Sequence, residues 1–198
     1  MMLTELQYFG TISYIKSIIE ARTINFNENE LFAKMSFKNR TIIASAQGPL
    51  NLTIPIVGGR DQKNKLKDIQ IDYSTDWHKL HLKSIKSCYK RAPFFDYYEE
   101  SLSVLLETKK DNLFDFLFDI QVWVKDQFKN NWSISEIDTN DTIEIFRDPY
   151  LPKNYTTYTS IKYQQVFEEQ IGFLNNLSVL DILFCCGGKQ ASNLLKSS

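Results

Sequence analysis

The chain has 198 residues, 23 basic and 24 acidic side chains, and a formal net charge of −1. Nucleic-acid binding requires a strongly basic surface, and the sequence pI is about 6.1, so we expect no nucleic-acid partner. This length suits one domain that buries about 70 % of its unfolded surface. We therefore predict a single domain over residues 1–198.

The three cysteines, two of them adjacent at Cys185 and Cys186, form neither a disulfide framework nor a zinc-binding spacing. No apolar run approaches the roughly twenty residues of a membrane span, and the first residues lack the pattern of a secretion signal. The seven glycines form no phosphate loop and no dinucleotide fingerprint. We expect a cytoplasmic protein with no membrane span, no metal and no cofactor.

The first half of the chain reads as short strands around one helix. Residues 1–20 predict a strand, a turn at Gly10 and a helix, and Ile24–Phe26 predicts a second strand. A short helix is predicted over 31–37. The clearest element is a β-hairpin of Arg40–Ala46 and Leu50–Val57 around Gln47-Gly48-Pro49. Alternating residues over 67–73 predict a half-exposed strand.

Residues 76–90 predict a helix with two different faces. Its capping residues are Ser74 to Asp76, and Pro93 prevents its continuation. The residues at three- and four-residue spacing are predicted to form an inward face, which comprises Trp77, Leu80, His81, Ser84, Ile85, Cys88 and Tyr89. The opposite face carries Lys79, Lys83, Lys86 and Lys90, a row that is more often a solvated surface than a binding site.

Further helices are predicted from Pro93 and Asp111, followed by a long loop over 132–163 that contains a brief strand at 142–146. A short helix then begins near Ser178 and ends at Gly187, and the tail after Lys189 is expected to be loose. This order predicts an α+β fold, with a mixed sheet and a central hairpin packed against several helices. An open α/β fold is the alternative, if the first strand and helix begin a crossover unit.

Several motifs in this order resemble the WbqC-like proteins of bacterial surface-polysaccharide gene clusters. The matching motifs are Tyr8-Phe9; Lys34, Phe37, Asn39 and Arg40; Gly48-Pro49; Trp77 and His81 leading to Tyr89, Ala92, Pro93, Phe94 and Phe95; Tyr163, Gln165 and Phe167; and Asn176 to Phe184. The sequence departs from the family pattern at Gly10, Thr11 and Cys185. The His-Gln-Pro triplet of the longer branch is replaced here by Thr4, Glu5 and Leu6.

The resemblance implies a role in building O-antigen or a related polysaccharide. The protein would act as a group transferase on a nucleotide- or carrier-activated sugar, or as a non-catalytic module that binds a sugar or a partner of the same pathway. Either role implies a small anionic or sugar-linked ligand. The sequence leaves the oligomeric state open. The motifs add Tyr8, Trp77 and Tyr89 to the substrate-binding candidates.

His81 is the main catalytic candidate. An imidazole beside the indole of Trp77 can titrate near neutrality and act as a general base, whereas the alternative is a buried histidine with satisfied ring nitrogens. His78 lies at the helix start, where free amides attract a phosphate. Arg40 can fork onto a phosphate, Lys34 adds charge, and Asn39 can bind a sugar hydroxyl or hold a turn.

Asp181 is the second catalytic candidate, as a carboxylate three residues after Ser178. The same spacing fits a capping box, which is the stronger interpretation unless His78 or His81 lies close in space. Cys185 and Cys186 end this helix, where the dipole raises the pKa of a thiol, so no cysteine nucleophile is expected.

Overall fold

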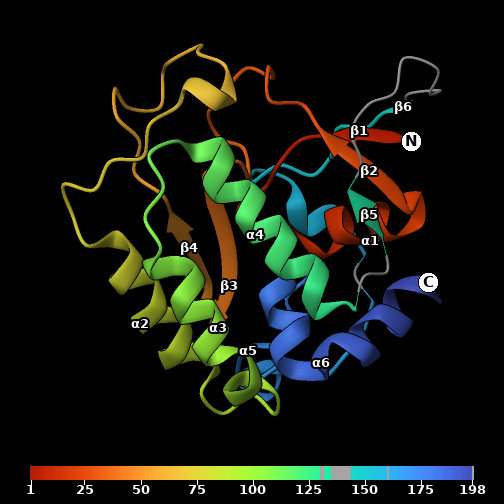
Figure 1. Ribbon diagram of the computed structural model, residues 1–198. Coiled ribbons are helices and arrows are strands. Elements are labelled where there is room, and N and C mark those ends of the chain that lie inside the picture. The colour runs from red at the N-terminus through yellow and green to blue at the C-terminus, as the bar shows by residue number, and fades with distance from the viewer. Residues whose placement is uncertain (130–131, 135–143, 160, 198) are drawn as a thin grey trace.

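The computed structural model describes residues 1–129, 132–134, 144–159 and 161–197 (Figure 1). Its strands are Met2–Thr4 (β1), Thr23–Phe26 (β2), Arg40–Ser45 (β3), Gly48–Thr53 (β4), Ser133–Ile134 (β5) and Glu144–Ile145 (β6). Its helices are Ile12–Ala21 (α1), Trp77–Tyr89 (α2), Phe95–Glu107 (α3), Leu113–Gln127 (α4), Glu168–Ile171 (α5) and Val179–Lys196 (α6), with 3-10 turns at Leu66–Asp68 (η1) and Tyr155–Thr157 (η2). The fold is α+β, as predicted.

The strands form two separate sheets. β1 pairs in parallel with β2 and β6, and β2 pairs in parallel with β5, which gives the order β5-β2-β1-β6. The crossover that the α/β alternative required is therefore present, because α1 connects the parallel strands β1 and β2. The Thr11 hydroxyl caps α1 by accepting from the amide of Tyr14.

The predicted hairpin is confirmed as the antiparallel pair β3 and β4, although its turn is shorter than expected. Ser45 pairs with Gly48 across a two-residue turn, and Pro49 pairs with Ala44 inside the strand. Gly48 has a φ of 113°, which a residue with a side chain rarely adopts. At the open end, the Asn39 side-chain amide donates to the carbonyl of Ile54 at 2.9 Å, and the Ile54 amide donates to the carbonyl of Asn39.

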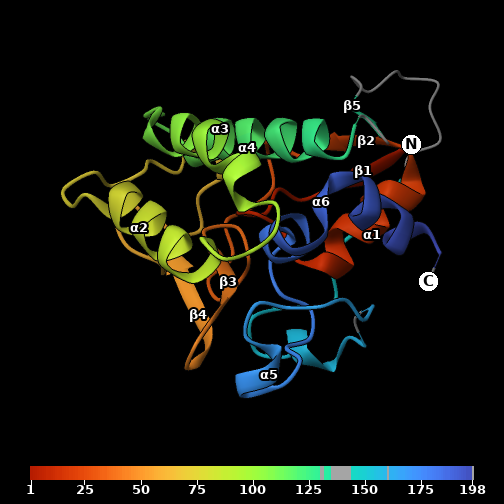
Figure 2. The ribbon, with the colours of Figure 1, turned by 90° about the horizontal axis from the view of Figure 1, so that it is seen from below.

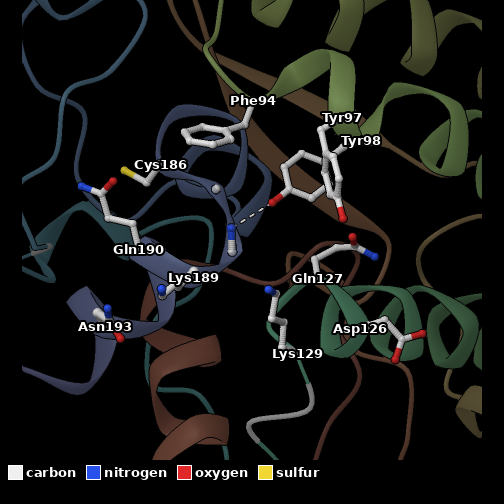
Figure 3. Close-up of a pocket in the computed structure, with 12 residues that line it drawn as sticks. Phe94, Tyr97, Tyr98, Asp126, Gln127, Lys129, Cys186, Lys189, Gln190 and Asn193 are labelled. Carbon is white, nitrogen blue, oxygen red and sulfur yellow. Dashed lines mark hydrogen bonds between the residues drawn. The ribbon is translucent and has the colours of Figure 1, made fainter.

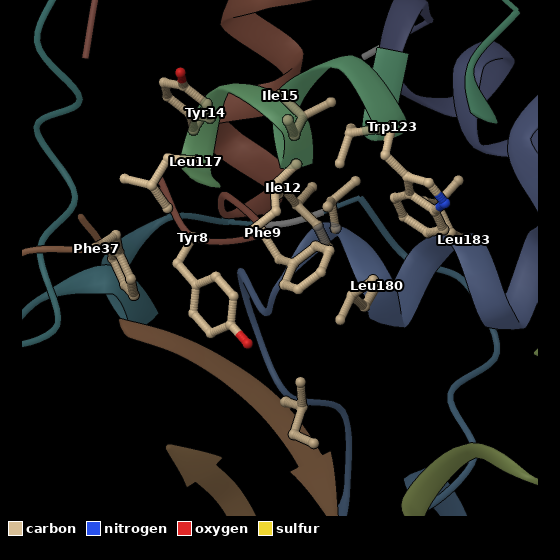
Figure 4. Packing of buried hydrophobic residues seen from close by; sticks show 14 of the residues in the cluster. Tyr8, Phe9, Ile12, Tyr14, Ile15, Phe37, Leu117, Trp123, Leu180 and Leu183 are labelled. Atoms are coloured by element: carbon tan, nitrogen blue, oxygen red, sulfur yellow. The ribbon is translucent and has the colours of Figure 1, made fainter. Parts of the chain in front are cut away.

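The helices pack around one aromatic-rich cluster. Figures 1 and 2 show α2 beside the hairpin, with the parallel sheet at the other end of the molecule near the N-terminus. The cluster includes residues from Met2 to Leu195. Figure 4 shows Phe9 of the β1–α1 connection between α4 and α6, with its ring edge-on to Trp123 at 6.0 Å between centroids.

A bend at Gly187 divides α6 into two helical parts. Gly187 has a φ of 72° and a ψ of 154°, so it ends the first part, as predicted. The chain then resumes a helix, and the expectation of a loose tail after Lys189 is wrong. Ala191 and Leu195 have no exposed surface, which explains why this second part is ordered against the core.

Two more expectations need correction. Residues 67–73 form no regular strand, because η1 is followed only by isolated bridges at Gln70 and Ile71. Residues 31–37 contain turns instead of the predicted helix. In both segments tertiary contacts replace the local pattern: Leu66 and Ile69 are buried, and Leu31 bridges to Lys65. Of the brief strand at 142–146, residues 142 and 143 lie outside the described residues.

A substitution of Gly188 tests the contact between α6 and α4. A Cβ atom at this position would lie 1.9 Å from the backbone carbonyl oxygen of Gln127. Because backbone cannot move aside easily, we expect Gly188→Ala to lower the free energy of unfolding by about 3 kcal/mol or more in urea denaturation.

Gly172→Ala is the matched control, since Gly172 has a positive φ but no atom within 4 Å of the added carbon. That change should cost about 1 to 3 kcal/mol, from backbone strain without any overlap, because glycine is nearly alone in adopting a φ of 78° with a ψ of 173°. A Gly188→Ala variant as stable as the wild type would show that the contact at Gln127 does not hold α6 close to α4.

Candidate functional site

The two faces of α2 are confirmed, with one exception. Trp77, His78, His81, Ile85 and Tyr89 are buried, whereas the four lysines are exposed. Leu80, predicted on the inward face, is 61 % exposed. Asp76 precedes the helix but makes no side-chain capping bond, and its carboxylate lies 3.3 Å from Lys79 Nζ instead. This carboxylate opposes the predicted binding of an anion at the helix start.

His81 lies in a buried contact between α2, the β1–α1 connection and the hairpin. Its Nδ1 is 2.8 Å from the hydroxyl of Tyr8, and its ring is edge-on to Trp77 at 5.1 Å between centroids. The backbone of Thr53 also hydrogen bonds to the ring. Burial raises the pKa of Tyr8, so its hydroxyl keeps its proton. These contacts fit a neutral imidazole that accepts from Tyr8 and donates to the carbonyl of Thr53.

Burial, followed by the nearby His78, lowers the pKa of His81 to about 4. The ring is therefore neutral at pH 7, and its polar atoms are already used within the protein. These contacts favour the buried-histidine alternative that the sequence left open. The catalytic role of His81 stays a prediction, and it would require a ligand to displace Tyr8 or Thr53.

His78 and Trp77 occupy the same aromatic cluster as His81. The ring of His78 is edge-on to Trp77 and Tyr73, with centroids 5.8 and 6.0 Å away. Its Nδ1 and the indole nitrogen of Trp77 are buried, and neither has a hydrogen-bond partner within the described parts of the chain. Their ligand-binding roles stay predictions.

Asp181 is fully buried among three side-chain donors. Its carboxylate accepts from the hydroxyls of Tyr89 at 2.7 Å and Tyr163 at 2.5 Å, and from the amide of Gln165 at 3.1 Å. The expected capping box does not form, because the amide of Ser178 donates to the carbonyl of Ile42. Burial raises the pKa of Asp181, although its three donors oppose this shift. These contacts favour a structural carboxylate, and the catalytic role of Asp181 and the binding role of Tyr89 stay predictions.

The three residues at the hairpin entry do not form one cluster. Lys34 is exposed and pairs with Asp61 at 2.7 Å, while Asn39 holds the base of the hairpin. Arg40 is half-buried and pairs in register with Thr53, the residue whose backbone contacts His81. Of the three, Arg40 is thus the one whose strand partner contacts His81.

A buried ion-pair cluster was missed from the sequence. Lys38 is 1 % exposed, and its Nζ lies 2.5 Å from Glu5 and 3.2 Å from Glu30. Gln7 connects Glu5 to a second buried carboxylate, Asp148, at 2.9 Å. Such partners hold segments together, because an unpaired buried lysine is very costly. In the sequence, Lys38 is a single lysine between Phe37 and Asn39, and nothing in this pattern distinguishes it from an exposed lysine.

A cavity of about 600 Å³ lies elsewhere, between α3, α4 and the bend in α6 (Figure 3). Phe94, Tyr97 and Tyr98 lie on one side of this pocket. The other side carries polar side chains, which are Asp126, Gln127, Lys129, Lys189, Gln190 and Asn193. None of the site residues predicted from the sequence lines the pocket.

The bend at Gly187 and Gly188 shapes this pocket. A Cβ on Gly187 would lie 2.9 Å from the ring of Phe94, and the amide of Gly188 donates to the Tyr98 hydroxyl at 2.8 Å. Tyr97 is 78 % exposed, so its ring is open to a ligand. The sequence did contain a signal: two glycines followed by Ala191, Leu194 and Leu195 at helical spacing indicate a bend between two helices.

The cysteine that lines the pocket, Cys186, is not an activated nucleophile. Burial, followed by the charge of Asp181, raises the pKa of Cys186 to about 11, so its thiol stays protonated at neutral pH. The pKa of Cys185 is also raised, by burial first. The expected high thiol pKa values are therefore confirmed, but the main cause is burial rather than the helix dipole. Within the described residues, no group of three or more His, Cys, Asp or Glu side chains could hold a metal ion.

In the same described ranges, no helix is long and apolar enough to cross a membrane. A model of the WbqC-like protein family matches residues 7–141, about two thirds of the chain. This match includes α2 and the α3 and α4 sides of the pocket, but not α6 or Asp181. No curated protein and no solved structure matches the chain.

The lowered pKa of His81 predicts a pH-dependent stability. The folded pKa of about 4 lies below the reference value of 6.5. Between these values the unfolded state binds more protons, so stability is retained above pH 6.5 and is lost as the pH falls toward 4. Between pH 7.5 and 5.0 the loss due to His81 should be about 2 kcal/mol.

The measurement is urea denaturation of the wild type and of His81→Gln at both pH values. Other titrating groups are common to the two proteins, so the difference between their pH dependences isolates His81. A variant with the same pH dependence as the wild type would contradict the buried, neutral ring.

Proposed function

This chain belongs to the WbqC-like protein family, and from this membership we propose that it takes part in building a surface polysaccharide by binding a small anionic, sugar-linked molecule. The family resemblance supports the pathway. The pocket between α3, α4 and α6 supports the binding, and it is the observation that carries the proposal. We name a nucleotide sugar as the ligand class.

The size of the pocket suits this class. Small-molecule sites commonly measure about 300 to 1,000 Å³, combine aromatic walls with a few polar groups, and are largely preformed. The pocket of about 600 Å³ has all three properties, since its wall is fixed by the α6 bend and by the bond from Gly188 to Tyr98.

The lining residues offer one contact for each part of such a ligand. The exposed ring of Tyr97 can pack against a base or the apolar face of a sugar. Gln127, Gln190 and Asn193 both donate and accept hydrogen bonds, as sugar hydroxyls require. Lys129 and Lys189 supply positive charge for a diphosphate.

Group transfer is the second proposal, with His81 and Asp181 as its catalytic residues and with Lys34, Arg40 and His78 holding the donor. Its support is the sequence motif of α2. We rank it below simple binding because the polar atoms of His81 and Asp181 are engaged in internal hydrogen bonds.

Isothermal titration calorimetry with UDP-N-acetylglucosamine, UDP and N-acetylglucosamine tests the binding proposal. We expect the nucleotide sugar to bind most tightly, because it engages both the aromatic wall and the lysines. Loss of one stacking or phosphate contact costs about 1 to 3 kcal/mol, so Tyr97→Ala and Lys189→Ala should each weaken binding by roughly fivefold or more.

Lys83→Ala, on the exposed face of α2, is the matched control and should leave affinity unchanged. Arg40→Ala tests the competing site. Unchanged binding in Tyr97→Ala and Lys189→Ala, together with a loss in Arg40→Ala, would move the ligand to the hairpin and α2.

A further inference from the structure

Two loops, residues 27–36 and 57–67, lie against each other and are called the paired loops below. The amide of Phe32 donates to the carbonyl of Asn64 at 2.9 Å, and the amide of Leu66 donates to the carbonyl of Glu30 at 2.7 Å. Lys34 and Asp61 form a third link at 2.7 Å. In Figure 1 they run along the upper edge of the molecule, at the end opposite α5.

The paired loops expose three large apolar side chains. Leu31 is 57 % exposed, and Met35 and Val57 are each 50 % exposed. None of the three packs against the hydrophobic core. Met35 has a φ of 59°, a left-handed conformation that is uncommon for a residue of its size. These three apolar side chains are therefore exposed to solvent and have no packing role in the core.

The same loops are basic, in contrast with the rest of the chain. They carry five basic side chains, which are Lys34, Arg60, Lys63, Lys65 and Lys67, against three acidic ones, which are Glu28, Glu30 and Asp61. Their net charge is therefore +2, whereas the whole chain has −1.

Internal pairing neutralises all three acids. Asp61 pairs with Lys34, Glu28 with Lys67 at 3.0 Å, and Glu30 with the buried Lys38. Arg60, Lys63 and Lys65 remain exposed without an ion-pair partner in the described ranges. Three exposed basic side chains without an ion pair thus lie on the same two loops as the three exposed apolar side chains.

We infer that the paired loops dock on the surface of a lipid bilayer that contains anionic headgroups. Apolar side chains enter the boundary between headgroups and acyl chains, while long basic side chains reach the phosphates around them. An acidic protein fits less well, because the centre of a protein interface is closely packed and apolar, whereas the exposed apolar residues here are single and none is adjacent to another along the chain.

The lysine face of α2 is basic like the paired loops but has fewer exposed apolar side chains. It has four exposed lysines but one exposed apolar residue, Leu80. Two of its lysines are already paired, Lys79 with Asp76 at 3.3 Å and Lys86 with Glu99 at 2.5 Å. Lys83 and Lys90 therefore offer a control with the same change in net charge at a different surface.

Co-sedimentation with vesicles tests the inference. The wild type should bind phosphatidylcholine vesicles that contain phosphatidylglycerol, bind pure phosphatidylcholine vesicles much more weakly, and dissociate as salt is added. Each basic residue near an anionic surface contributes about fivefold to affinity, so Lys63→Ala/Lys65→Ala should weaken binding by about 25-fold. Leu31→Ser/Met35→Ser should also weaken it, without any change in net charge.

Lys83→Ala/Lys90→Ala should bind as the wild type does, and equal melting temperatures would show that all variants fold. Equal weakening in this control would reduce the effect to net charge and overturn the inference. Failure of the wild type to bind anionic vesicles would also overturn it, as would retention on immobilised polyglutamate without vesicle binding, which would assign the loops to an acidic protein.

Discussion

The buried carboxylate of Asp181 is the interaction on which much of the structure depends. A carboxylate without exposed surface is tolerated only with several hydrogen-bond donors, and here they come from Tyr89 of α2 and from Tyr163 and Gln165 of the loop before α5. Tyr89 also accepts from the amide of Ala44 in β3. One side chain of α6 thus connects a helix, the hairpin and a long loop.

The glycine bend follows six residues after this carboxylate, and the two features together place the pocket. Asp181 fixes the first part of α6 in the core, where Val179, Ile182 and Phe184 have no exposed surface. Gly188 then passes directly over the end of α4, closer than any side chain would permit. The second part of α6 is therefore turned so that Lys189, Gln190 and Asn193 face the aromatic residues of α3.

The buried residues of the histidine helix make their contacts within the protein. Aromatic rings and internal partners surround His81, and the charged residues of α2 point to solvent. Within this arrangement, Tyr8, Thr53 and His81 connect the β1–α1 segment, the hairpin and α2. A neutral imidazole suits this contact because one ring nitrogen accepts a hydrogen bond and the other donates one.

By itself the sequence determined the elements whose periodicity reflects burial along one face: the hairpin, the inward face of α2, and the helices that begin near Pro93 and after Asp111. It also determined the α+β class and the family. Only the tertiary structure decided the 67–73 segment, where long-range packing overrode alternation, and the partners of Asp181, which lie up to 92 positions away. The pocket and the paired loops were likewise beyond a local reading. Each combines segments distant along the chain: the two glycines indicate a bend, but only folding brings α3 and α4 against it.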